Sequence, residues 1–162
     1  MQPGPSSQAW LDWDAAVGRL LREASGAEAR LTSLLRVLSG MDGPVAARVL
    51  PRDVPGMTAV ARDLLPVHVR DPHLLDDLVR WVHAVGRLCE LRAAVVHSLW
   101  EPAGDESMRA VWSGAPDLPH PRTAAELGRT TAALSRFQGA GADELFLRLD
   151  KAAPELQVFA RS

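Results

Sequence analysis

The stretch LLDDLVRWVHAVGRLCELRAAVVHSL, residues 74–99, determines the fold class that we expect for this chain. Its apolar side chains recur at alternating steps of three and four residues, the spacing that puts side chains on one face of an α-helix. The residues of this face are Leu75, Leu78, Val82, Val85, Cys89, Arg92, Val96 and Leu99. No proline interrupts the stretch, so we predict one long helix from Leu74 to Leu99.

Helical spacing continues upstream of this stretch. Apolar residues keep it from Val17 to Leu38, past Gly26, as one long helix or two, up to a stop at Ser39-Gly40. Glycines and prolines then interrupt the chain, leaving room for a short helix at 45–49. A further short helix is expected at 57–65, ended by Pro66.

Downstream, Thr123 and Glu126 have the spacing of a capping box, which predicts a helix that continues to Gly139. Gly139 to Gly141 form a hinge or a cap, and a last amphipathic helix covers residues 143–152. The segment 108–112 could be a short strand or a helical turn. With strand patterns this rare, the sequence predicts an all-α fold, an antiparallel bundle of four to five helices, rather than a parallel α/β fold.

A chain of 162 residues fits one domain. We expect a flexible tail at 1–7, a single helical domain at 8–153 and a C-terminal tail at 154–162. Apolar residues make up 47% and charged residues 23%, as in ordinary globular proteins. The net charge of -2 provides no general attraction to nucleic acid, so an RNA contact would need a local patch.

The single cysteine, Cys89, excludes an internal disulfide and fits the reducing cytoplasm, and we expect it to be a small buried apolar residue. The N-terminal residues lack a basic region followed by an apolar core, and no apolar run is long enough to cross a bilayer. We therefore predict a cytoplasmic protein that does not enter a membrane.

Arg92 is the only charge on the apolar face of the 74–99 helix. Burying an unpaired guanidinium is costly, so the site must supply an anion, a carboxylate partner or a solvated cleft. One structural interpretation pairs Arg92 with a core carboxylate such as Glu28 and leaves His97 on the surface. The other interpretations are catalysis by Arg92 and His97, and ligand binding without catalysis.

Arg92 and His97, with Glu90, Ser98 and Trp100 beside them, resemble the R-x4-6-H signature of the HEPN superfamily, here as R-x4-H. The upstream helix at 15–38 is also similar to the first helix of stand-alone bacterial members. The resemblance implies a HEPN-like helical bundle, a homodimer, and a metal-independent endoribonuclease of the toxin or defence type. Ala93 stands where the family usually has a polar residue, most often asparagine.

The resemblance implies that Arg92 binds the scissile phosphate and that His97 acts as acid or base, with no metal and no cofactor. A guanidinium suits a phosphate because it offers paired donors, and an imidazole can exchange protons near neutral pH. Glu90 could orient either residue, and Ser98 could bind a phosphate oxygen. The alternative function is a non-catalytic helical dimer that binds a nucleotide phosphate or a protein partner such as an antitoxin, or that is purely structural.

Three observations limit the sites that this region can form on a regular helix. Five residues of helix turn the side-chain direction by about 140°, so Arg92 and His97 would not share a helical face unless the helix is distorted. His83, Glu90 and His97 are seven residues apart, too far along a helix for one metal ion. No nucleophile elbow surrounds Ser98, and we expect the histidines at positions 68, 73 and 120 to be exposed in loops.

Overall fold

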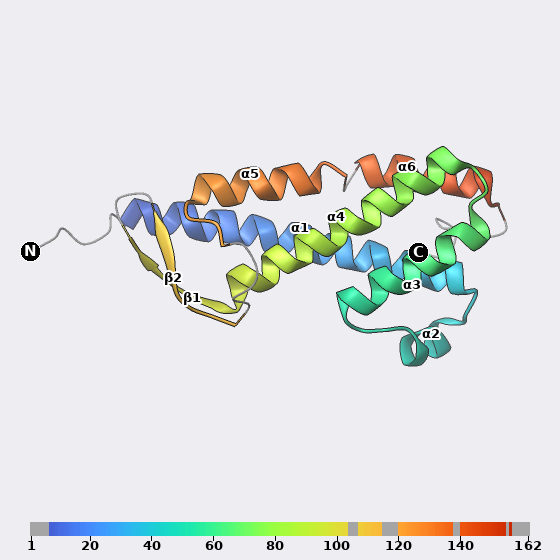
Figure 1. The fold of residues 1–162 in the computed structure, drawn as a ribbon, viewed down its shortest axis with the longest axis horizontal. Helices are drawn as coiled ribbons and strands as arrows, with labels where there is room; N and C mark the ends of the chain where they lie inside the picture. The colour runs from blue at the N-terminus through green and yellow to red at the C-terminus, as the bar shows by residue number, and fades with distance from the viewer. Residues whose placement is uncertain (1–6, 104–106, 115–119, 138–139, 155, 157–162) are drawn as a thin grey trace, which may run out of the picture. The chain divides into compact units, whose positions relative to one another are not determined.

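The computed structural model describes residues 7–103, 107–114, 120–137, 140–154 and 156. In this part of the chain, six helices and one two-stranded sheet are present, coloured in chain order in Figure 1. The predicted helical class is therefore confirmed, with more helices than expected and a β-hairpin that the sequence analysis left undecided. The elements are α1 Ser7–Ser39, α2 Gly43–Val49, α3 Val54–His68, α4 Pro72–Val96, β1 Ser98–Pro102, β2 Met108–Ser113, α5 Ala124–Ser135 and α6 Ala140–Ala152.

The chain divides into two compact units. The first unit consists of Met1–Ser25 and Arg87–Ser135, and the second consists of Gly26–Gly86 and Arg136–Ser162. Helices α1 and α4 contribute residues to both. The expectation of a single helical domain at 8–153 stays a prediction, and most residues of the two predicted tails lie outside the described part of the chain.

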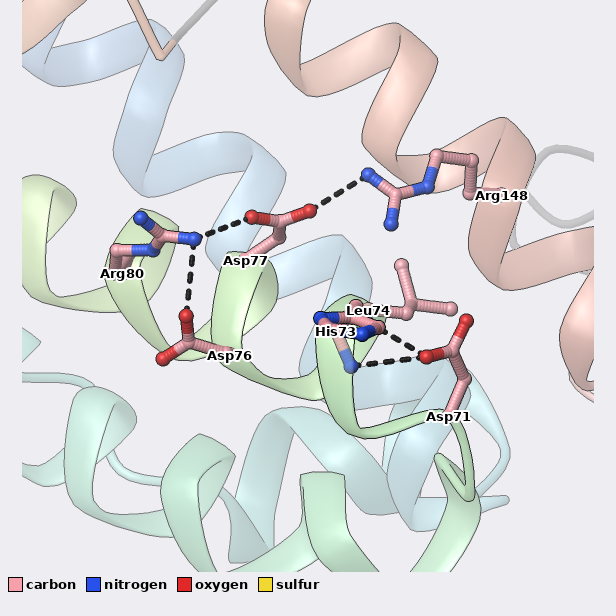
Figure 2. Close-up of polar contacts among 7 residues, drawn as sticks. All are labelled: Asp71, His73, Leu74, Asp76, Asp77, Arg80 and Arg148. Atoms are coloured by element: carbon pink, nitrogen blue, oxygen red, sulfur yellow. Dashed lines mark hydrogen bonds and ion pairs between the residues drawn. The ribbon is translucent and has the colours of Figure 1, made fainter.

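In the second unit, acidic side chains fix the start of α4 and bind α6. Asp71 caps α4, because its Oδ1 accepts the backbone N–H of His73 at 2.9 Å, as Figure 2 shows. Asp77 accepts hydrogen bonds from Arg80 on its own helix and from Arg148 on α6, each at 2.7 Å. The hydrogen bond from Arg148, together with the charges of both arginines, outweighs partial burial and holds the pKa of Asp77 below its ordinary value of 3.8.

Helix α1 resolves the question of one upstream helix or two. It runs unbroken from Ser7 through Gly26 to Ser39. Gly40 follows with a φ of 63°, a left-handed conformation that glycine adopts without a steric penalty, so the predicted stop at Ser39-Gly40 is confirmed.

Helix α3 corrects the expectation that Pro66 ends the helix. The helix continues to His68, and the Val69 N–H closes its last turn on the Leu65 carbonyl at 2.9 Å. A proline this close to a helix end removes one hydrogen bond from the final turn only, so the chain keeps helical geometry for two more residues.

Helix α4 ends earlier than predicted, at Val96 instead of Leu99. The last carbonyl groups of a helix lack hydrogen-bond donors within the helix. In α4, side chains of β1 provide donors for two of these carbonyl groups. Ser98 Oγ donates to the Ala94 carbonyl at 2.5 Å, and Trp100 Nε1 donates to the Val95 carbonyl at 2.8 Å. Two polar groups of β1 thus act as the C-terminal cap of α4.

The β-hairpin settles the alternatives left open for 108–112. Strands β1 and β2 are antiparallel and pair Ser98 with Ser113 and Pro102 with Met108, with an irregularity between Leu99 and Trp100. Residues 108–112 are therefore a strand and not a helical turn. The side chains of Leu99 and Trp112 lie opposite each other in this register, and each is 62% exposed.

The capping box of α5 is present, as predicted. The Glu126 N–H donates to Thr123 Oγ1 at 3.0 Å, and Glu126 Oε2 accepts the Arg122 N–H at 2.8 Å. The helix ends at Ser135, before the predicted Gly139, which lies outside the described residues. Gly141 lies within α6, which begins three residues before the predicted start at Asp143.

Candidate functional site

The candidate residues lie in the first unit, at the junction of α4 with the hairpin. Arg92 is half-buried in the last turns of α4, and His97 is exposed in the turn that joins α4 to β1. The apolar face proposed for this helix is buried from Leu78 to Cys89. Beyond Arg92 it opens to solvent, because Val96 is 48% exposed and Leu99 has left the helix.

The main chain of His97 is held on both sides. Its N–H donates to the Ala93 carbonyl at 3.0 Å, and its carbonyl accepts the Gly114 N–H at 2.8 Å. A side chain at position 114 would be crowded, because a Cβ there would lie 3.0 Å from the His97 oxygen. The exposed imidazole of His97 is thus attached to a fixed backbone.

His97 follows the helix rather than belonging to it. Its N–H still forms an i to i−4 hydrogen bond with Ala93, so the helix places the His97 backbone, about 140° around the helix axis from Arg92.

The two supporting residues are engaged with groups other than Arg92 and His97. Glu90 forms an ion pair with Arg87, with 2.8 Å between Glu90 Oε2 and Arg87 Nη1. Ser98 Oγ donates to the Ala94 carbonyl and contacts Ser113 Oγ at 3.1 Å and His120 Nε2 at 3.2 Å. Their orienting and phosphate-binding roles stay predictions.

A polar cluster that the sequence did not indicate begins at Ser98, directly after His97. It consists of Ser98, Ser113 and His120, and its shortest side-chain contact is 2.8 Å between Ser113 Oγ and His120 Nε2. The expected exposure of His120 in a loop is wrong, because its ring is half-buried and lies 5.8 Å from the Trp100 ring. The cluster joins the start of β1, the end of β2 and the segment before α5.

The single hydroxyl hydrogen of Ser98 limits what its contact with His120 can be. Ser98 has a single hydroxyl hydrogen, and the Ala94 carbonyl, which can only accept, receives it. Toward His120 the Ser98 oxygen therefore acts as an acceptor, so that contact is a hydrogen bond only when Nε2 carries the hydrogen. With its hydrogen directed at Ala94, Ser98 is not arranged as a serine nucleophile activated by a histidine base at His120.

The sequence contains only one weak signal for this cluster. Alternation in Met108-Arg109-Ala110-Val111-Trp112 hinted at a strand, and a strand there brings Ser113 opposite Ser98. His120, between prolines, gives no periodic pattern, and its partners are 7 and 22 residues away. Only the hairpin brings the three together.

Cys89 is buried, as predicted, and two of the tryptophans are buried as well. Cys89 is 5% exposed, with Sγ 4.0 Å from the Ala24 carbonyl oxygen. Trp13 and Trp81 are buried, and the Trp13 and Trp100 rings are 4.7 Å apart. Trp112 differs from Trp13 and Trp81, because it is 62% exposed.

Comparison with protein-family models, with curated proteins and with solved structures found no match. Within the described residues, no helix is both long enough and apolar enough to cross a membrane. In the same part of the chain, no three histidine, cysteine or acidic side chains are grouped as metal ligands.

Proposed function

We propose that the protein is a HEPN-like, metal-independent endoribonuclease in which His97 transfers protons and Arg92 binds the scissile phosphate. The observation that carries this proposal is the exposed imidazole of His97 on a backbone held at both its N–H and its carbonyl. A general acid or base must reach its substrate and keep a fixed position, and His97 meets both conditions.

Arg92 supports the proposal through its position in α4. Arg92 is half-buried, and a guanidinium offers paired hydrogen-bond donors that suit a phosphate oxygen. His97 would take the 2′-hydroxyl proton, the 2′ oxygen would attack the adjacent phosphorus, and the bond to the 5′ oxygen would break. The products are a 2′,3′-cyclic phosphate and a 5′-hydroxyl, with the leaving oxygen protonated by His97 of the partner subunit.

A homodimer is part of this proposal, and the hairpin offers a surface for it. Leu99 and Trp112 are cross-strand neighbours on one face, and both are mostly exposed. Exposed paired apolar side chains of this size are typical of contact surfaces, where tryptophan is a frequent anchor.

Phosphate binding without cleavage is the second candidate, and Ala93 favours it. A methyl group follows Arg92 where the resembled family usually has a polar side chain, so one hydrogen-bonding group is missing beside the arginine. A protein of this kind would hold RNA or a nucleotide at Arg92 and leave the 2′-hydroxyl unreacted.

Cleavage of a pool of structured and single-stranded RNA distinguishes these functions. We expect His97→Ala to lower the cleavage rate by about 10² to 10⁴-fold, the usual contribution of a general acid or base. His83→Ala, at an exposed histidine of α4, is the matched control and should leave the rate unchanged. Equal rates for both variants would reject His97 as a catalytic residue.

Arg92→Gln separates a catalytic arginine from a structural one. If Arg92 binds phosphate, the variant protein loses cleavage or RNA affinity, while its free energy of unfolding changes little. If Arg92 neutralises a buried carboxylate instead, the variant protein is destabilised by about 3 kcal/mol or more, because the carboxylate is left unpaired. Chemical denaturation of the variant, measured beside the cleavage assay, gives both values.

A further inference from the structure

A cavity of about 650 Å³ lies in the first unit, in a part of the hairpin that the proposed cleavage does not use. Its lining comes from β1, from β2 and from the segment before α5, all between residues 100 and 122. The volume falls in the range of sites for small organic ligands, roughly 300–1,000 Å³.

The apolar part of the lining includes Trp100, Met108 and Pro121. Trp100 is fixed by its Nε1 hydrogen bond to the Val95 carbonyl and by contacts with the Trp13 and His120 rings. A flat ring whose position is set before binding favours a planar partner, because little conformational freedom is lost when the two pack together.

The charge on the lining is positive. Among the described lining residues are Arg109, Arg122 and the imidazole of His120, and none of these described residues is acidic. Arg109 is neutralised by its ion pair with Glu101 across the hairpin. Within the described residues the Arg122 guanidinium has no carboxylate partner, since Glu126 accepts the main-chain N–H of Arg122. Among the described lining residues, Arg122 is therefore the cation best placed to pair with a ligand.

We propose that this cavity binds a small aromatic carboxylate, with its ring against Trp100 and its carboxylate on the Arg122 guanidinium. The apolar wall accounts for the ring, and the single charge of Arg122 favours a monoanion over a phosphate dianion. The proposal is independent of RNA cleavage, because neither Arg92 nor His97 lines the cavity.

Indole-3-carboxylate is the probe, and indole-3-carboxamide is its uncharged match. Titration of the ¹⁵N-labelled full-length protein, followed by amide NMR, should move the signals of residues 100, 101, 103, 107–110, 120 and 122. We expect the carboxamide to bind at least about tenfold more weakly, the loss expected for one charge-assisted hydrogen bond.

The variant Arg122→Gln keeps the backbone N–H that Glu126 accepts and removes only the charged group. It should weaken binding of the carboxylate about tenfold, to the affinity of the carboxamide. Arg129→Gln, at an exposed arginine of α5, is the matched control and should bind like the unmodified protein. Equal affinity for acid and amide, equal affinity of both variants, or no shifts at the lining residues would overturn the proposal.

Discussion

At the scale of single residues, Ser98 and Trp100 explain how α4 ends without a glycine. Each donates a side-chain hydrogen bond to a carbonyl of the last helical turn, at Ala94 and at Val95. The sequence predicted Arg92 and His97 as a pair, and it could also have indicated that serine can bond to a carbonyl four residues earlier. It could not indicate the indole contact, because that depends on the direction in which the strand leaves the helix.

Asp77 provides a pH-dependent test at the same scale. We expect Asp77→Asn to lower the free energy of unfolding by about 0.5–1 kcal/mol at neutral pH, a range that allows for solvent screening of a carboxylate that is 34% exposed. The folded pKa of Asp77 lies below the ordinary 3.8. The stabilisation is therefore complete above pH 3.8 and is lost as the pH falls through the lowered folded value.

Chemical denaturation of both proteins over a pH series measures this difference. Asp76→Asn is the control, because Asp76 is 67% exposed and, within the described residues, forms its ion pair with Arg80. A gap between the unmodified protein and Asp77→Asn that stays constant below pH 3.8 would contradict the assigned role of the Asp77 carboxylate.

At the scale of elements, the long helices were predictable and the hairpin was not. Apolar spacing identified α1 and α4, because each helix buries one continuous face. The same spacing gave a wrong end for α4, because Leu99 fits the helical period but lies exposed in strand β1. Strand β1 is short and depends on pairing with β2, a contact that no local pattern in residues 98–102 encodes.

The capping box of α5 gives a prediction for one element. Thr123→Ala removes the acceptor of the Glu126 N–H and should lower the free energy of unfolding by about 1 kcal/mol. Thr130→Ala, at an exposed threonine within the same helix, should change it by much less. Thermal denaturation followed by circular dichroism compares the two, and equal midpoints would show that the cap contributes nothing measurable.

At the scale of the whole molecule, the proposed activity requires two copies of the chain. We expect the protein to sediment as a dimer and Trp112→Glu to sediment as a monomer, because a charge on the exposed hairpin face opposes apolar association. Val67→Glu replaces an equally exposed apolar side chain of α3 and should leave the dimer intact. A monomeric unmodified protein, or a dimer that withstands Trp112→Glu, would reject the hairpin as the interface.

The chemistry of the RNA ends produced in EDTA tests the central claim most directly. If His97 drives attack by the 2′-hydroxyl, EDTA leaves cleavage unaffected, the fragments carry 2′,3′-cyclic phosphates and 5′-hydroxyls, and His97→Ala forms them about 10² to 10⁴-fold more slowly. Cleavage that stops in EDTA, or fragments with 5′-phosphates and 3′-hydroxyls, would contradict the proposed mechanism. RNA that is bound but left intact would instead identify the protein as a phosphate-binding module.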